Sequence, residues 1–294
     1  MQAIFREFQT GENRYQDDPV HTYRNNPAYK INQRILASVV GAIAVLLPFV
    51  LMAGFAFFGT CFYQSISHFY YSRFFGDVFV VSLAVIATFL IAYRGTNPSE
   101  SRLATAAGLA TFGVALFPTT GAGCTFSPVT GRAFVRMGLG EGSVTQFALP
   151  GDSGIAAFEL FGASGMLHYI AASVLFGFLA WYSLFVFTRV EKKDRKRGSN
   201  QLTETKKLRN TIYVVSGTVI LMSIAMLLAS VLLEKFNGIV ISGGLLDYWT
   251  FTFEALALWA FGIAWITKGR VWNRYLLEET EIREMRKTGN AKPD

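Results

Sequence analysis

Six long apolar stretches constrain the fold of this chain more than any other feature of its sequence. They lie at residues 35–58, 77–93, 103–117, 164–188, 211–233 and 246–267. A hydrocarbon core ~30 Å thick is crossed by about 20 helical residues. Lipid offers no hydrogen-bond partner to an open strand, so a spanning segment of this kind must be helical. We therefore predict an all-α, polytopic membrane helix bundle with six transmembrane helices.

The composition supports a membrane location. Apolar residues make up 52% of the chain and charged residues only 16%, and its 27 Phe outnumber every charged residue type. Such a balance is unusual for a water-soluble domain of this size. The third stretch is short and rich in Gly and Ala, which is expected of a helix wedged between others.

The basic residues predict the orientation. Of the 27 Lys and Arg residues, 23 fall in the arm 1–34, the second connection, the basic loop 189–210 and the tail 268–294. The other four are Arg73, Arg132, Arg136 and Lys235. The positive-inside rule then places both termini in the cytoplasm, and we expect a bacterial inner (cytoplasmic) membrane. We assign the net charge of +7 to this bias and to anionic lipid headgroups, so no nucleic-acid partner is expected.

The predicted organisation has three parts. A cytoplasmic arm covers residues 1–34, the six-helix domain covers 35–267, and an interfacial helix and tail cover 268–294. The domain includes a long outer loop at 119–163 with nine glycines. Its second half either forms a lid over the outer surface or is a plain exposed loop.

Residues 65–81, SISHFYYSRFFGDVFVV, hold the densest chemistry in the chain. Hydroxyls, an imidazole, aromatic rings, a guanidinium and a carboxylate precede a long apolar run. Aromatic rings with a polar edge favour the boundary between water and lipid, where a carboxylate is also tolerated. We interpret this stretch as the outer lip of a membrane-embedded site.

Three titratable residues on different predicted helices have similar depths. Asp77 lies at the outer mouth, His168 ~6 Å below its helix start and Glu254 ~10 Å below Asp247. Because charge is costly within lipid, we expect these side chains to turn inward and converge. The predicted ligand pocket has Asp77, His168 and Glu254 as its floor; its rim comprises Ser65, Ser67, His68, Tyr71 and Arg73.

Several functions remain open at this point. The cluster could fix the bundle by hydrogen bonds between helices, or grip the headgroup of a lipid or small amphiphile, or belong to an accessory subunit that contacts other membrane proteins. The alternative is a metal-dependent membrane hydrolase of lipid amides or esters, with zinc on His68, His168 and Asp77 or Glu254. In that case Asp77, His168 and Glu254 are the catalytic candidates. The chain lacks HExxH and has only three His, one of them His21 in the arm.

The two cysteines are both predicted on the outer side. Cys61 follows the first stretch and Cys124 follows the third. An oxidising outer compartment would allow a disulfide between them, which would tie the long loop to the bundle. Two unrelated thiols are the other possibility.

Three segments resemble a group of uncharacterised bacterial membrane proteins. They are SISHFYYSRFFGD, MLHYIAAS and FEALALWAFGIAWITKG. In plan the chain is similar to the six-span Frag and DRAM-like proteins. That resemblance implies six helices and marks the family-type positions Ser65, Ser67, Asp77, His168 and Glu254. A more distant likeness is to the alkaline ceramidase and PAQR class of membrane metal hydrolases, although this chain lacks their paired His in a last helix and has six predicted spans rather than seven.

Overall fold

The computed structural model describes residues 27–60, 62–95, 97–117, 119, 121–122, 134–135, 147–148, 155–156, 163–190, 194, 200–241 and 243–270. Four of the sequence-based predictions fall elsewhere. The lid in the second half of the outer loop lies almost wholly outside the described residues, as do the interfacial helix of the tail, His21 and the disulfide between Cys61 and Cys124. These remain predictions.

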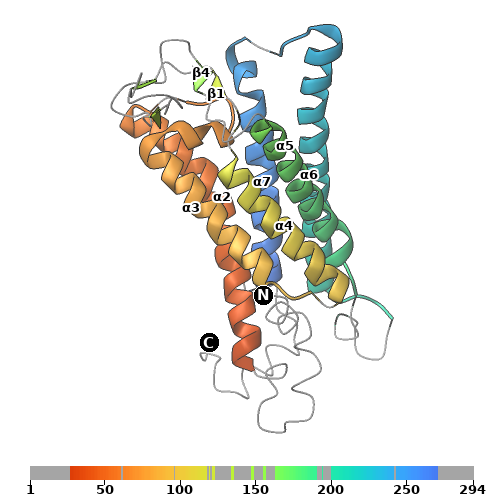
Figure 1. Ribbon diagram of the computed structural model, residues 1–294. Helices are drawn as coiled ribbons and strands as arrows, with labels where there is room; N and C mark the ends of the chain where they lie inside the picture. Colours follow the sequence, from red (N-terminus) through yellow and green to blue (C-terminus); the bar gives the residue numbers. More distant parts are fainter. Residues whose placement is uncertain are drawn as a thin grey trace.

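The described part of the chain is a bundle of helices (Figure 1). Its long helices are α2 (Pro27–Phe58), α3 (Arg73–Ala92), α4 (Pro98–Leu116), α5 (Ser164–Trp181), α6 (Glu204–Asn237) and α7 (Trp249–Gly269). Three short helices accompany them: η2 (Ser67–Tyr71) before α3, the π-helical η3 (Tyr182–Val186) after α5, and η5 (Gly244–Tyr248) before α7. Pro27 at the start of α2 and Pro98 at the start of α4 suit first-turn positions, which need no backbone donor.

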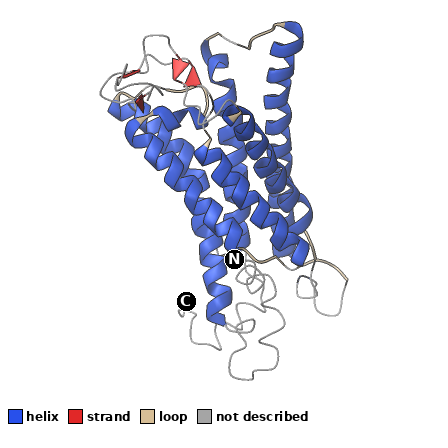
Figure 2. Cartoon of the chain, in the orientation of Figure 1, coloured by secondary structure: helices blue, strands red, loops and turns tan. Residues whose placement is uncertain are grey.

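The described part of the chain confirms the all-α class, and its only strands are four of two residues each. β1 (Gly121–Ala122) pairs antiparallel with β4 (Ile155–Ala156), and β2 (Phe134–Val135) pairs antiparallel with β3 (Phe147–Ala148). All four belong to the long outer loop (Figure 2). The helical prediction missed them because strands of two residues leave no periodic pattern.

Five of the described helical segments are long and apolar enough to cross a membrane. They cover Arg34–Phe58, Arg73–Ala92, Gly165–Val186, Glu204–Asn237 and Gly244–Gly269. This confirms the membrane-helix character of the chain. The remaining predicted stretch, 103–117, lies almost entirely in α4, which starts with the polar sequence PSESR and packs between α3 and α5. A sixth span therefore stays a prediction.

Glycines let α2 and α7 approach closely along their length. A Cβ at Gly41 would lie 2.6 Å from the Gly262 carbonyl oxygen, and one at Gly262 would lie 2.5 Å from the Gly41 carbonyl oxygen. Small residues serve this purpose in membrane bundles, where packing rather than hydrophobic transfer holds helices together. Trp259 adds a hydrogen bond from its indole Nε1 to the Val45 carbonyl at 3.0 Å. The contact between α2 and α7 is thus the most extensive helix–helix contact among the described helices.

The two ends of the bundle can be defined from α7. Gly269 contacts Arg34 and Ser38 of α2 and marks the basal end, while Trp249 stands 20 residues away at the outer end. At 1.5 Å per residue this separation is about 30 Å, which matches a hydrocarbon core. The outer end carries η2, η5 and the short strands, and the basal end carries the start of α6 (Figure 1).

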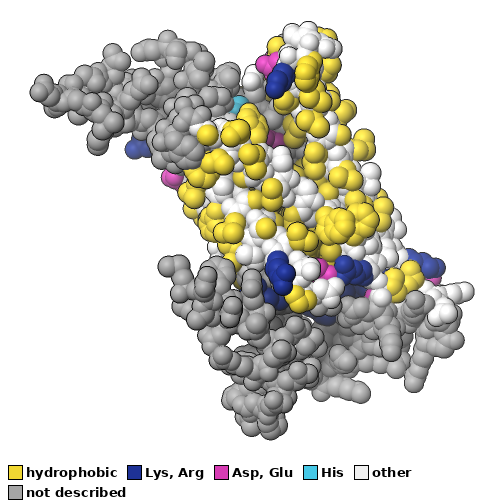
Figure 3. Space-filling view, turned by 45° about the vertical axis from the view of Figure 1, so that its right-hand side comes forward, with side chains coloured by type: hydrophobic (Ala, Val, Ile, Leu, Met, Phe, Trp, Pro, Cys, Tyr) yellow, Lys and Arg dark blue, Asp and Glu magenta, His cyan; other side chains and the backbone are white. Residues whose placement is uncertain are grey.

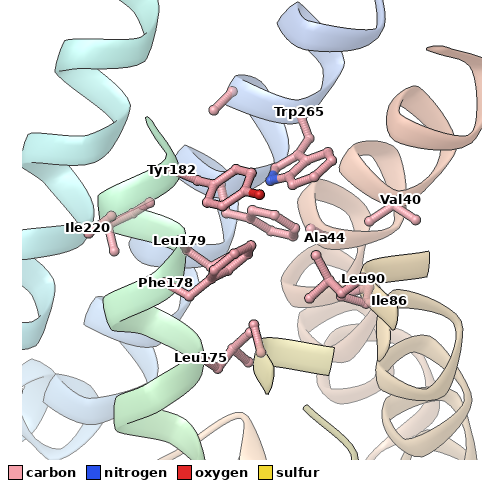
Figure 4. Packing of buried hydrophobic residues seen from close by; sticks show 14 of the residues in the cluster. Val40, Ala44, Ile86, Leu90, Leu175, Phe178, Leu179, Tyr182, Ile220 and Trp265 are labelled. Carbon is pink, nitrogen blue, oxygen red and sulfur yellow. The ribbon is translucent and has the colours of Figure 1, made fainter. Parts of the chain in front are cut away.

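Aromatic rings fill the basal half of the core. The indole of Trp265 is fully buried and lies 4.9 Å from Phe89, 5.1 Å from Tyr93 and 5.3 Å from Phe187, measured between ring centroids. Tyr182 stacks nearly parallel to the same indole (Figure 4). A separate cluster of buried apolar residues lies near η2 at the outer end. The bundle therefore has two packed layers joined by α2 and α7.

We expect Gly262→Ala to destabilise the bundle although Ala is the better helix former. The added methyl group would meet the Gly41 carbonyl and the Val45 side chain, and overpacking of this kind costs about 1–3 kcal/mol. Gly177→Ala on α5 is the matched control, because a Cβ added there would have no neighbouring atom within 4 Å. Thermal unfolding in detergent should show a lower Tm for Gly262→Ala and an unchanged or higher Tm for Gly177→Ala. Equal shifts for the two variants would contradict the close α2–α7 contact.

Candidate functional site

The carboxylate of Glu254 on α7 receives hydrogen bonds from the connection between α2 and α3. The Ser65 hydroxyl donates to its two oxygens at 3.0 and 2.8 Å, and the Ile66 backbone N–H donates to Oε2 at 2.6 Å. Ile66 is the N-cap residue of η2, so the carboxylate supplies an acceptor where a helix start leaves N–H groups unpaired. The structure therefore brings Ser65 and Glu254 together as a clasp, which we call the outer clasp.

Ser67 extends the outer clasp by one hydroxyl. Its backbone N–H donates to Ser65 Oγ at 3.2 Å, and the two serine hydroxyls are 2.8 Å apart. Because the Ser65 proton is directed to Glu254, the Ser67 hydroxyl is the donor in this pair. Ser65 and Ser67 are both buried, so the network is protected from water by the protein itself.

Two further contacts hold η2 against the bundle. The Phe251 backbone N–H on α7 donates to the Gln64 carbonyl at 2.8 Å, and the Tyr71 hydroxyl donates to the Thr119 carbonyl at 2.6 Å. The Phe62 ring lies 4.7 Å from both Tyr248 and Phe251. Residues 62–72 thus form a packed cap on the outer end, with polar groups facing α7 and aromatic rings around them.

His68 and His168 are neighbours at this end. The His168 ring nitrogen Nδ1 lies 2.7 Å from the Phe117 carbonyl and donates to it, which fixes the proton on that nitrogen. The Nδ1 atom of His68 is buried and has no hydrogen-bond partner among the described residues. Burial, and next the proximity of His168, lower the pKa of His68 to about 4. His68 is therefore a neutral imidazole at physiological pH.

Asp77 and Arg73 differ from Glu254 and His168 in their exposure. Both are exposed on the first turns of α3, whereas Glu254 is only partly exposed and His168 is buried.

Tyr169, exposed on α5, lies within electrostatic reach of Glu254 and of Glu234 on α6. Among the described residues, the polar groups linked to Glu254 thus include Ser65 and Ile66 in the connection between α2 and α3, and Tyr169 on α5. Tyr169 was absent from the predicted pocket, because a lone tyrosine at the start of an apolar stretch carries no distinguishing pattern.

The structure offers no support for a metal centre in its described part. No group of three or more His, Cys, Asp or Glu side chains lies close enough to share a metal ion among these residues. In the outer clasp, both oxygens of Glu254 already accept hydrogen bonds from the chain itself.

A second polar network lies at the basal end. Asp194, 2% exposed, pairs with Arg209 at 3.0 Å and with Lys206 at 3.6 Å. Lys206 also donates to the Phe187 carbonyl at 3.3 Å and to the Arg189 carbonyl, where the helix formed by α5 and η3 ends. A cation at a helix C-terminus is favourable, so Lys206 joins the start of α6 to the end of η3.

Glu100 on α4 completes this basal network. It is 4% exposed and forms an ion pair with Arg189. Asn97 donates to Glu100 Oε1 at 3.1 Å, and the buried Tyr182 hydroxyl donates to the Glu100 backbone carbonyl at 2.9 Å. The ion pair joins α4 to the segment that follows η3. The basal network therefore links four segments: α4, the segment after η3, the connection at Asp194 and the start of α6.

The prediction of a basic loop at 189–210 missed this network. α6 in fact begins at Glu204, with the Thr203 hydroxyl accepting from the Lys206 backbone N–H at its N-cap. The missed signal is a helical repeat: Lys206 and Arg209 continue the buried face formed by Tyr213, Ser216 and Ile220. This buried face of α6 begins before the apolar stretch 211–233, and its first two residues, Lys206 and Arg209, are cations.

We expect Glu254→Ala to release the cap at residues 62–72. Removing the carboxylate leaves the Ile66 N–H and the Ser65 hydroxyl without their acceptor, at a cost of about 1–3 kcal/mol. Asp77→Ala is the matched control, since it deletes an exposed carboxylate at the same end. Hydrogen–deuterium exchange should rise in residues 62–72 for Glu254→Ala only. Equal exchange in both variants would rule out the clasp.

The contribution of His68 to the stability of the protein should fall as the pH is lowered from about 6.5 to about 4. The pKa of His68 is below its ordinary value of 6.5 in the folded state, so the unfolded chain binds more protons across this range. The stabilisation is complete above the unfolded value and is lost as the pH approaches 4. His68→Asn should weaken this dependence in a Tm-against-pH series. A profile identical to that of the unmodified protein would contradict the assignment to His68.

Comparison of the chain with protein-family models, curated proteins and solved structures finds no significant match. The two polar networks and their depth in the bundle are therefore the features that bear on function.

Proposed function

We propose that the outer end of this protein binds the headgroup of an uncharged membrane amphiphile, with membrane lipids as its partners. The observation that carries this proposal is His68. A buried ring nitrogen without a partner among the described residues is costly, and a ligand that hydrogen-bonds to it would remove that cost. His168 stands beside it with its own Nδ1 already committed to Phe117.

The electrostatics of the outer end favour an uncharged ligand. His68 is neutral at physiological pH, and Glu254 is engaged by Ser65 and Ile66. An anionic headgroup would meet Glu254 and Glu234 without a buried cation among the described outer residues to offset them. A hydroxyl-bearing headgroup, such as that of a glyceride, can donate to or accept from a neutral imidazole.

The position of the cluster favours a ligand that is held partly in lipid. Glu254 lies five residues below Trp249, or about 8 Å along α7. Exposed apolar side chains continue below the cluster on α5, among them Ile170 and Val174. A headgroup at His68 would therefore leave the acyl chains against the helices.

We further propose the orientation and the sixth span. Lys and Arg side chains gather around the basal end in Figure 3, with apolar side chains above them. This distribution supports a cytoplasmic basal end and cytoplasmic termini. A bacterial inner membrane is our proposal for the location. α4 supports a sixth span by its place between α3 and α5, where its Ala104, Ala107 and Thr111 are buried.

The proposal is tested by native mass spectrometry of the protein in an oligo-oxyethylene detergent with added dioleoylglycerol. We expect bound dioleoylglycerol on the unmodified protein and about tenfold weaker binding by His68→Phe, the effect of about 1.4 kcal/mol that one hydrogen bond supplies. Ser173→Ala, which removes an exposed hydroxyl from α5, should bind normally. Absence of binding by the unmodified protein, or equal binding by His68→Phe, would overturn the proposal.

A further inference from the structure

The outer end of α6 projects beyond the helices beside it. The Trp249 indole donates to the Met226 carbonyl at 3.3 Å, so Met226 lies at the level of Trp249, the outer limit of the span along α7. α6 continues from there to Asn237, a further distance of about 16 Å at 1.5 Å per residue. Figure 1 shows this part of α6 rising above the outer end of α5. It therefore stands outside a hydrocarbon core that matches α7.

The projecting part of α6 is apolar and uncovered. Ser223 is the last buried residue of α6, although the helix continues to Asn237. Phe236 is 74% exposed, and Val231 and Leu232 are exposed as well. Acyl chains can cover apolar side chains within the membrane, but not those beyond it. A patch of exposed apolar side chains outside lipid marks a contact with another protein surface.

The exposed side of α6 carries a regular pattern that links its membrane part to its projecting part. Six residues follow one another in alternating steps of four and three residues, which is the heptad spacing of paired helices. We call them the α6 stripe; they are Thr218, Met222, Ala225, Ala229, Leu232 and Phe236. All are exposed except Ala229, which is half-buried. The stripe thus crosses the outer limit of the membrane without interruption.

The composition of the α6 stripe favours a helix as its covering surface. Thr218, Ala225 and Ala229 are small, and small residues allow two membrane helices to approach closely. Acyl chains adapt to side chains of any size and need no such residues. The apolar stretch 211–233 also has no charged residue that a second helix would have to neutralise. Both features suit close packing of one helix on another.

We propose that the α6 stripe binds the α6 stripe of a second copy of this chain, which forms a parallel dimer. The positive-inside bias gives all copies the same orientation, so a two-fold axis along the membrane normal sets equal depths of the two α6 helices together. A second copy therefore brings its own projecting helix to the same height. Lipid cannot cover that height, and another protein would need an apolar helix that projects equally far.

The exposed area is sufficient for a stable contact. Leu221 and Leu228 flank the α6 stripe and are about half exposed. Together with the stripe they offer on the order of 600 Å² per copy, close to the roughly 800 Å² per partner of a standard protein interface. The α6 helix is also the least covered of the candidate spans, with 22% of its apolar window buried. The dimer would bury the side of α6 that its own bundle leaves open.

The first test measures association of the whole protein in an oligo-oxyethylene detergent. Monomer and dimer are counted by native mass spectrometry over a dilution series, and we expect a dimer that dissociates on dilution. Phe236→Asp should raise the dissociation constant at least about tenfold, because it sets two like charges against each other in place of two apolar rings. Leu245→Asp is the matched control, since Leu245 is 89% exposed at the same end but lies on η5. It should change the constant less than about twofold.

The second test uses disulfide cross-linking in native membranes. Leu232→Cys and Glu234→Cys are made separately in a chain that carries Cys61→Ser and Cys124→Ser. Both positions are exposed, but at 3.6 residues per turn they point about 200° apart around α6. Mild oxidation should therefore link two copies through Leu232→Cys and leave Glu234→Cys monomeric.

Several results would overturn the proposal. They are a monomer at every concentration, equal effects of Phe236→Asp and Leu245→Asp, and equal cross-linking through the two cysteines. A cross-link from Leu232→Cys to a different protein would show that the stripe has another occupant. If Phe236→Asp does not fold, the cross-linking comparison decides alone. The dimer does not depend on the outer amphiphile site, which is tested by lipid binding, so each proposal can fail without the other.

Discussion

The fold depends on one constraint: a polar group drawn into an apolar bundle must find a partner inside the protein. Glu254 meets this constraint at the outer end through Ser65 and Ile66, and Asp194 meets it at the basal end through Lys206 and Arg209. Each carboxylate holds in position a segment that connects two of the long helices. The outer one fixes the cap at 62–72, and the basal one fixes the junction between η3 and α6.

The two ends differ in charge, and this difference bears on the ligand proposed for the outer end. The outer end has a neutral imidazole, His68, beside an engaged carboxylate, which favours an uncharged headgroup. The basal end instead has two buried cations at the start of α6, Lys206 and Arg209, and both pair with Asp194. Between the two ends the core around Trp265 is closely packed.

Part of the outer site could be predicted from the sequence because depth follows from helix geometry. Counting residues from the ends of the apolar stretches placed Glu254 and His168 near the outer surface. The same count could not say which way a side chain points, and Asp77 illustrates this, since it is exposed on α3. It also could not anticipate that Ser65 and Glu254, far apart in the chain, share hydrogen bonds.

The sequence by itself determined that the chain forms membrane-crossing helices, because apolar runs of this length have one stable form in lipid. Its basic residues also predicted which end faces the cytoplasm. Only the tertiary structure decided which polar groups meet, since the rotation of each helix and the path of each connection follow from packing. The contact of Gly41 with Gly262 sets α2 against α7, and that pairing brings the cap at 62–72 to Glu254. No local pattern encodes such a contact, because it depends on residues from both ends of the chain.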